Sequence, residues 1–208
     1  MNPTAPQPSL ARLRDIQLES PWRELGEGFA AANGGPAPWR QRKRGELRNV
    51  LALAQISGRI LVGEASLATD LRLDLLLRVP VPCLPDPAGA LEVAPVARLG
   101  VIYRPEAAVV PQPGYAFVRI LQPRHVWLPA VSPDEHQALC LGSRLPAGIP
   151  ITEILLLTWG ALAMTTIQLD PANFAGVLNP AAARWWQANT DKIPLTREPF
   201  LNQEPKPC

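Results

Sequence analysis

The chain has 208 residues, of which 47% are hydrophobic and 18% charged, and its formal net charge is +2. This composition is typical of a folded globular protein of about one domain. The small net charge gives no reason to expect nucleic-acid binding. No segment reaches about 18 apolar residues without a charge, so the sequence does not predict a membrane span either.

The three cysteines are odd in number and widely spaced. They therefore predict neither a disulfide framework nor a Cys-x-x-Cys metal pair. The chain starts with a polar, proline-bearing segment that lacks the apolar core of a secretory signal. Free thiols and the missing signal core favour the reducing cytoplasm. We expect neither a metal nor a cofactor.

Two short helices are predicted near the amino terminus. Residues 1–8 are expected to be a disordered leader, and Ser9 to cap a helix whose apolar residues recur at helical spacing. A second helix is expected to begin at Pro21, because proline suits the first helical turn, and to end before Gly34-Gly35. The basic run 40–44 is predicted to be a solvated linker, with a docking patch for an acidic partner as the alternative.

The middle of the chain predicts an antiparallel sheet. Five segments have the apolar alternation or the apolar content of strands: 49–56, 59–62, 71–79, 99–103 and 115–121. Ser57-Gly58 is the expected turn between the first two. The prolines of 80–87 cannot continue a sheet, because proline lacks the N–H that a strand ladder needs. Four or five meandering strands result, in the simplest arrangement a four-stranded antiparallel meander.

Helices are predicted for the remainder. A strongly apolar helix runs from about Pro150 to Met164, and Asn179-Pro180 is a cap with proline at the first position of a short helix. Strands that precede helices favour the α+β class, one antiparallel sheet covered by helices. We expect a single domain from 9 to 189, followed by a proline-rich extended tail, 190–208.

Cys140 is the candidate functional residue. It follows an irregular, proline-rich segment that holds both histidines of the chain, His125 and His136, and Gly142 follows it. A thiol between a loop and a buried helix can be held rigidly and still reach water, and its thiolate is a nucleophile. A buried structural cysteine is the alternative, since free cysteine is among the most buried residue types.

Four segments together carry a resemblance to a known family: Leu139-Cys140-Leu141-Gly142, Ile151–Leu155, Leu178–Ala182 and the proline-marked connection 105–117. In this order they resemble ubiquitin-conjugating (E2) enzymes, in particular the prokaryotic E2-like proteins of bacterial ubiquitin-like conjugation operons. The resemblance implies a UBC-like fold with an N-terminal helix, a meander sheet, an active-site loop and C-terminal helices. It also implies a role in antiphage defence.

The resemblance further implies the chemistry of Cys140. An E1-like activating enzyme would deliver a ubiquitin-like modifier to Cys140 as a thioester, and an amine of a target protein would then take it. Eukaryotic E2 enzymes support the oxyanion with an Asn ahead of the cysteine, whereas no Asn lies between Tyr115 and Cys140. His125 as loop anchor, His136 as site-shaping residue, or backbone N–H groups near Gly142 are the candidate substitutes.

Two other functions stay open. A UBC-like or RWD-like binding module without conjugating activity would explain the missing Asn, although the retained Cys-Leu-Gly argues against it. A cysteine hydrolase would pair Cys140 with one histidine, but such enzymes usually have a distant histidine and a cysteine at a helix N-terminus. Asp134 and Glu135 are expected to be solvated, with steering or deprotonation of the incoming amine as the alternative.

Overall fold

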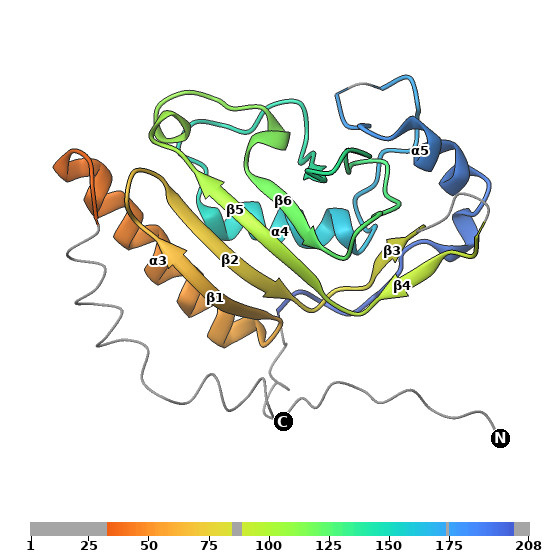
Figure 1. The fold of residues 1–208 in the computed structure, drawn as a ribbon, viewed down its shortest axis with the longest axis horizontal. Helices are drawn as coiled ribbons and strands as arrows, with labels where there is room; N and C mark the ends of the chain where they lie inside the picture. Colours follow the sequence, from red (N-terminus) through yellow and green to blue (C-terminus); the bar gives the residue numbers. More distant parts are fainter. Residues whose placement is uncertain (1–32, 85–88, 174, 202–208) are drawn as a thin grey trace, which may run out of the picture.

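The computed structural model describes residues 33–84, 89–173 and 175–201 and shows the α+β class that the sequence predicts (Figure 1). A long helix, α3 (Ala37–Ser57), and the apolar helix α4 (Ile151–Leu162) lie behind one antiparallel sheet in that view. The two helices predicted ahead of residue 33 lie outside the described residues. So does the end of the predicted tail.

The main sheet has five strands in the spatial order β1-β2-β5-β6-β7, and every neighbouring pair is antiparallel. Its strands are β1 (Ile60–Ser66), β2 (Leu71–Leu77), β5 (Ala97–Tyr103), β6 (Val118–Gln122) and β7 (Ala138–Leu139). A separate hairpin, β3 (Val81–Cys83) with β4 (Glu92–Ala94), is inserted between β2 and β5. The architecture is therefore larger than a four-stranded meander.

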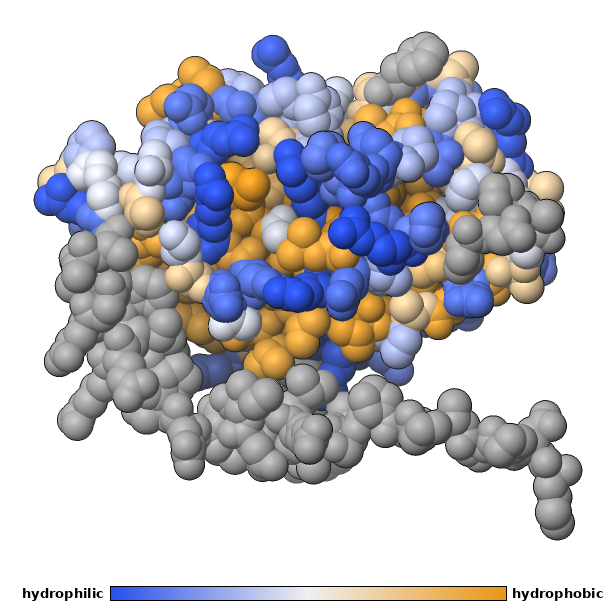
Figure 2. All heavy atoms as spheres, in the orientation of Figure 1, coloured by the Kyte–Doolittle hydropathy of each residue, from blue (hydrophilic) through white to orange (hydrophobic). Residues whose placement is uncertain are grey.

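Alternation along the central strands places the core on one face of the sheet. In β2 the odd-numbered leucines are buried, while Arg72 is exposed on the other face; β5 repeats this pattern with Arg98 exposed. Opposite residues in the ladder, such as Leu73 and Val101, are both buried. The outer face, towards the viewer in Figure 2, carries hydrophilic side chains with apolar ones between them.

Two predictions near the start of the described chain are wrong. Residues 49–56 are the second half of α3 rather than a strand, and the basic run 40–44 is its first half rather than a linker. Leu47, Val50 and Ala54 are buried at helical spacing. The expected turn at Gly58 is real, because Gly58 adopts φ 62° and ends the helix ahead of β1.

The proline segment also differs in part from its prediction. The main-sheet strand ends at Leu77, two residues before the predicted end at Val79, and Pro82 lies inside β3, paired with Val93. A two-stranded ribbon tolerates this proline because the missing N–H costs only one edge position. The carbonyl of Pro82 accepts a hydrogen bond from the N–H of Trp127, and this bond connects the β3–β4 hairpin to the segment ahead of Cys140.

The two predicted C-terminal helices are confirmed. α5 (Pro180–Gln187) begins at the expected proline, α4 begins at Ile151 directly after Pro150, and the side chain of Asn179 accepts from the N–H of Ala182 as a cap. No helix within the described residues is both long and apolar enough for a membrane span. Past α5, Phe200 is buried and its ring centroid lies 5.6 Å from that of Trp159 on α4.

Candidate functional site

Cys140 lies directly after β7, in a hairpin that spans residues 130–140. Its backbone N–H donates to the carbonyl of Ala130 at 2.7 Å, and Val131 pairs with Leu139. The hairpin is attached to the main sheet because β7 pairs with β6. The cysteine is therefore held by a sheet on one side and followed by a loop on the other; the sequence predicts the loop and the helix after it, but not the short strand β7 ahead of it.

The thiol of Cys140 faces two backbone carbonyl groups. Its Sγ lies 3.4 Å from the oxygen of Gly142 and 3.6 Å from the oxygen of Ala175, and the residue is 6% exposed. Carbonyl oxygens accept a hydrogen bond from a thiol and repel a thiolate. To act as a nucleophile, the sulfur has to turn away from both groups.

Both histidines are exposed, and neither is a hydrogen-bond partner of the Cys140 thiol, whose partners in the described residues are the carbonyls of Gly142 and Ala175. His125 has φ 57°, and its carbonyl accepts from the N–H of Leu84 at 2.9 Å. The ring of His136 lies 3.9 Å from a Glu135 carboxylate oxygen. Their predicted roles as loop anchor and site-shaping residue have no supporting side-chain contact with the thiol and stay predictions.

Gln137 is the loop anchor that the sequence did not indicate. Its side chain is buried; Nε2 donates to the carbonyls of Ile120 at 3.0 Å and Pro123 at 2.8 Å, while Oε1 accepts from the N–H of Val126 at 2.9 Å. One amide thus joins β6 to the turn around His125. A buried polar group with all these partners fixes a loop firmly.

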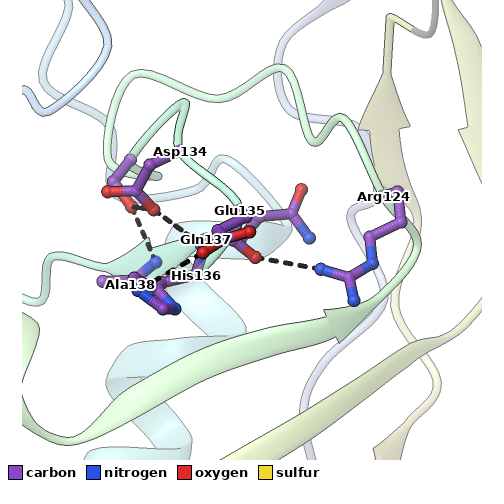
Figure 3. Close-up of polar contacts among 7 residues, drawn as sticks. Arg124, Asp134, Glu135, His136, Gln137 and Ala138 are labelled. Atoms are coloured by element: carbon purple, nitrogen blue, oxygen red, sulfur yellow. Dashed lines mark hydrogen bonds and ion pairs between the residues drawn. The ribbon is translucent and has the colours of Figure 1, made fainter.

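Asp134 organises the tip of the hairpin, which Figure 3 shows together with Arg124. Its carboxylate accepts from the hydroxyl of Ser132 at 3.0 Å and from the N–H groups of His136 and Gln137. The hydrogen bond from Ser132 and then those from the two backbone groups hold the pKa of Asp134 below its ordinary value. The carboxylate of Asp134 thus already accepts hydrogen bonds from residues of its own turn.

A hollow beside this tip is lined by charged side chains of both signs. Arg124 and His125 line it together with Asp134 and Glu135, and the guanidinium of Arg124 donates to the carbonyl of Glu135 at 2.9 Å. Cys140 is not among its lining residues. The hollow and the thiol are therefore two distinct features of the same hairpin.

The loop after Cys140 is bonded through its backbone to the connection between β5 and β6. That connection contains two short 3-10 helices, η1 (Pro105–Ala108) and η2 (Gly114–Ala116). Leu141 donates to Gly114 at 3.4 Å, and Leu145 exchanges two hydrogen bonds with Gln112. Gly148 donates to Ala107 at 2.8 Å. The loop after Cys140 and the 105–117 connection of the family resemblance thus lie side by side.

Glu46 on α3 holds the far end of this loop. Its carboxylate accepts from the N–H of Ile151, the first residue of α4, at 2.9 Å, which satisfies a donor that the helix itself leaves free. The Nε of Arg42 lies 2.8 Å from the other carboxylate oxygen. Arg42 also donates to the carbonyl of Gly148 at 2.7 Å and to the hydroxyl of Tyr103.

Helix α5 supports the hairpin from its other side. The N–H groups of Leu178 and Asn179 both donate to the carbonyl of Pro129, and the indole of Trp186 donates to the carbonyl of Trp127 at 2.7 Å. Trp186 is fully buried and its neighbour Trp185 only partly. The Asn-Pro-x-Ala segment therefore anchors the strand pair that carries Cys140.

Cys83 in β3 is a different kind of thiol. Burial raises its pKa from 9.0 to about 11, and its Sγ lies 3.5 Å from the carbonyl oxygen of Val81. Such a thiol is protonated at neutral pH and acts as a small apolar side chain. Cys208 lies outside the described residues.

The described residues contain no group of three or more His, Cys, Asp or Glu side chains placed to hold a metal ion. The site consists of one thiol, its supporting backbone and the polar hairpin tip. No protein-family model, no curated protein and no solved structure matches the chain.

Proposed function

We propose that the protein is an E2-like conjugating enzyme in which Cys140 carries a ubiquitin-like modifier as a thioester. The observation that supports this proposal is the placement of Cys140. It follows a sheet-bound strand, and a backbone-bonded loop and the buried helix α4 come after it. The capped helix α5 then supports the hairpin, and this is the order of elements that the family resemblance implies.

The proposed reaction consists of two acyl transfers. The sulfur of Cys140 bonds to the C-terminal carbonyl carbon of the modifier as the cysteine of an E1-like enzyme leaves, and the thiol proton ends on that leaving cysteine. An amine of the target protein then attacks the same carbon, forms an amide and returns the thiol of Cys140. ATP is consumed earlier, at the E1-like enzyme. The protein's own task is to present the sulfur of Cys140 to the modifier and to release the modifier from it again.

The surroundings of the thiol define what this reaction requires. Cys140 has to move off the carbonyls of Gly142 and Ala175, since both repel the charge that builds up on the sulfur and on the carbonyl oxygen. Binding of the E1-like partner is the step at which we place this movement. The partners, the cytoplasmic location and the role in antiphage defence belong to the same proposal and follow the family resemblance.

The test is a thioester assay with ATP and with an E1-like enzyme and a ubiquitin-like modifier of the proposed system. We expect a modifier-sized shift on a non-reducing gel that disappears with reductant and in Cys140→Ala. Cys83→Ala is the matched control and should form the adduct normally, because its protonated thiol lies in the β3–β4 hairpin. An adduct that survives in Cys140→Ala would show that another residue accepts the modifier.

One observation favours a second candidate, a UBC-like or RWD-like binding module without conjugating activity. The thiol is 6% exposed and faces carbonyl oxygens, and no Asn lies in the hairpin. This candidate predicts that the charged E1 leaves no adduct on the protein. It also predicts that Cys140→Ala binds its partner as tightly as the wild type does. A Cys/His hydrolase has less support, because neither histidine is a hydrogen-bond partner of the thiol in the described structure.

A further inference from the structure

We infer that Gly114 is a positioning residue for Cys140. The absence of a side chain at Gly114 determines where the carbonyl group of Gly142 lies against the thiol. This inference deepens the proposed function and rests on it only for the consequence for thioester formation. The contact itself concerns the reactivity of the thiol towards any electrophile.

The backbones of Gly114 and Gly142 approach too closely for a side chain at position 114. A Cβ on Gly114 would lie 2.2 Å from the oxygen and 2.7 Å from the nitrogen of Gly142. Both are backbone atoms, so neither can rotate away as the end of a flexible side chain would. Gly114 is buried, and its carbonyl accepts from the N–H of Leu141 at 3.4 Å. Any residue other than glycine at 114 therefore displaces the Gly142 peptide.

The same carbonyl group of Gly142 touches the thiol on its other side. The Sγ of Cys140 lies 3.4 Å from this oxygen. Gly142 has φ 123°, a conformation that only glycine adopts readily, while a Cβ there would meet open space. The two glycines thus serve different ends: Gly114 allows the close approach, and Gly142 allows the backbone turn that aims the carbonyl at the sulfur.

A displacement of the Gly142 peptide cannot easily continue into the residues that follow it in the loop. Beyond Gly142 it is fixed by two hydrogen bonds between Leu145 and Gln112, and by the bond from Gly148 to Ala107. A shift that begins at Gly142 is therefore taken up between this residue and Cys140. It moves an acceptor off the thiol and uncovers the sulfur.

The experiment measures alkylation of the native protein by iodoacetamide, in which the sulfur displaces iodide and the thiol proton passes to the buffer. Peptide mapping assigns the label to each cysteine. In Gly114→Ala we expect Cys140 to react at least about five-fold faster than in the wild type, through local opening, and Cys83 to be unchanged. Gly45→Ala is the matched control, because a Cβ on this α3 glycine meets nothing within 4 Å.

Two results would overturn the inference. One is an equal or slower alkylation of Cys140 in Gly114→Ala than in Gly45→Ala. The other is an equal acceleration of both cysteines, which indicates general loosening of the fold. If Gly114→Ala does not fold, Gly142→Ala takes its place: it has room for the methyl group but strains the φ of 123° and so turns the same carbonyl. It must give the same selective acceleration.

Measuring thioester formation distinguishes a failure of this inference from a failure of the proposed function. If Cys140 accepts a modifier, Gly114→Ala should raise kcat with charged E1 several-fold and leave KM within about two-fold, because the carbonyl that has to leave the thiol is already displaced while the partner surface is unchanged. If the alkylation result holds while the wild type forms no thioester, the positioning role stands and the conjugating function fails. If thioester forms but alkylation is unaffected, the positioning role fails alone.

Discussion

The α3 side and the Cys140 side of the molecule are held together by different kinds of bonds. At α3, buried side chains carry the contacts: Lys43 donates to the carbonyls of Gly34, Leu67, Ala68 and Thr69, and Glu46 accepts from Ile151. Around Cys140, backbone groups bond to backbone groups, and glycines allow them to approach. Four predictions use this contrast, from the largest expected effect to the smallest.

The difference has a mechanical consequence. A buried charged side chain that loses its partners costs its full desolvation free energy, so changes at α3 should appear as lost stability. A backbone contact at a loop can shift by a fraction of an ångström while the core stays packed. Changes near Cys140 should therefore appear first in the reactivity of the thiol.

The largest effect is expected for Lys43→Met. Lys43 is 0% exposed; its removal leaves the carbonyl of Gly34 without a donor among the described residues and takes one of two donors from the carbonyls of Leu67 and Ala68. We expect the free energy of unfolding to fall by about 3 kcal/mol. Urea denaturation measures it, and Arg44→Met, an exposed neighbour on α3, should change it by no more than about 0.5 kcal/mol. Equal losses in both variants would contradict the anchoring role of Lys43.

Glu46→Ala should cost about 2 kcal/mol, because it leaves the N–H of Ile151 without an acceptor and Arg42 without its ion partner. Glu46→Gln keeps an oxygen for Ile151 and should cost about half as much. Chemical denaturation of both variants gives the two values. A Gln variant as unstable as the Ala variant would show that the charge at Arg42, rather than the helix donor, makes this contact important.

A smaller loss is expected on the Cys140 side for Asn179→Ala. Its side chain caps α5 by accepting from Ala182 at 3.0 Å, and loss of such a cap costs about 1 kcal/mol. Asn179→Asp keeps the acceptor and should lose little. Thermal denaturation compares the two, with alkylation of Cys140 as a second measurement. We expect faster labelling only in Asn179→Ala, because α5 supports the hairpin through Pro129.

The smallest effect at neutral pH is that of Cys83, whose thiol changes the stability only above pH 9. Its pKa is raised to about 11 in the folded state, against 9.0 ordinarily. Below pH 9 both states keep the proton, and above it the unfolded chain loses the proton first, so stability falls as the pH rises from 9 to 11. Urea denaturation across this range should show a steeper fall for the wild type than for Cys83→Ala. Parallel curves would mean that the Cys83 thiol is not buried as described.

Local patterns predicted the elements whose burial follows a simple period. The alternation in β2 and the Asn179-Pro180 cap each depend on a few neighbouring residues, and both appear where expected. The α3 helix was missed because its buried face includes Lys43 and Glu46. With polar residues inside, the helical period of apolar residues disappears, and the apolar run 49–56 resembles a strand.

The residues of the candidate site likewise include some that the sequence predicted and some that it did not. Cys140, in a loop ahead of an apolar helix, was recognisable from its neighbours in the sequence. Gln137, Glu46 and Gly114 were not, because each acts on a residue brought close only by folding: Glu46 reaches Ile151 across 105 positions of the chain. Local patterns in the chain are enough to predict the α+β class and the loop that holds the thiol. The groups that face the thiol come from distant segments brought together by folding, and such a close approach of backbones leaves no periodic signal in the chain.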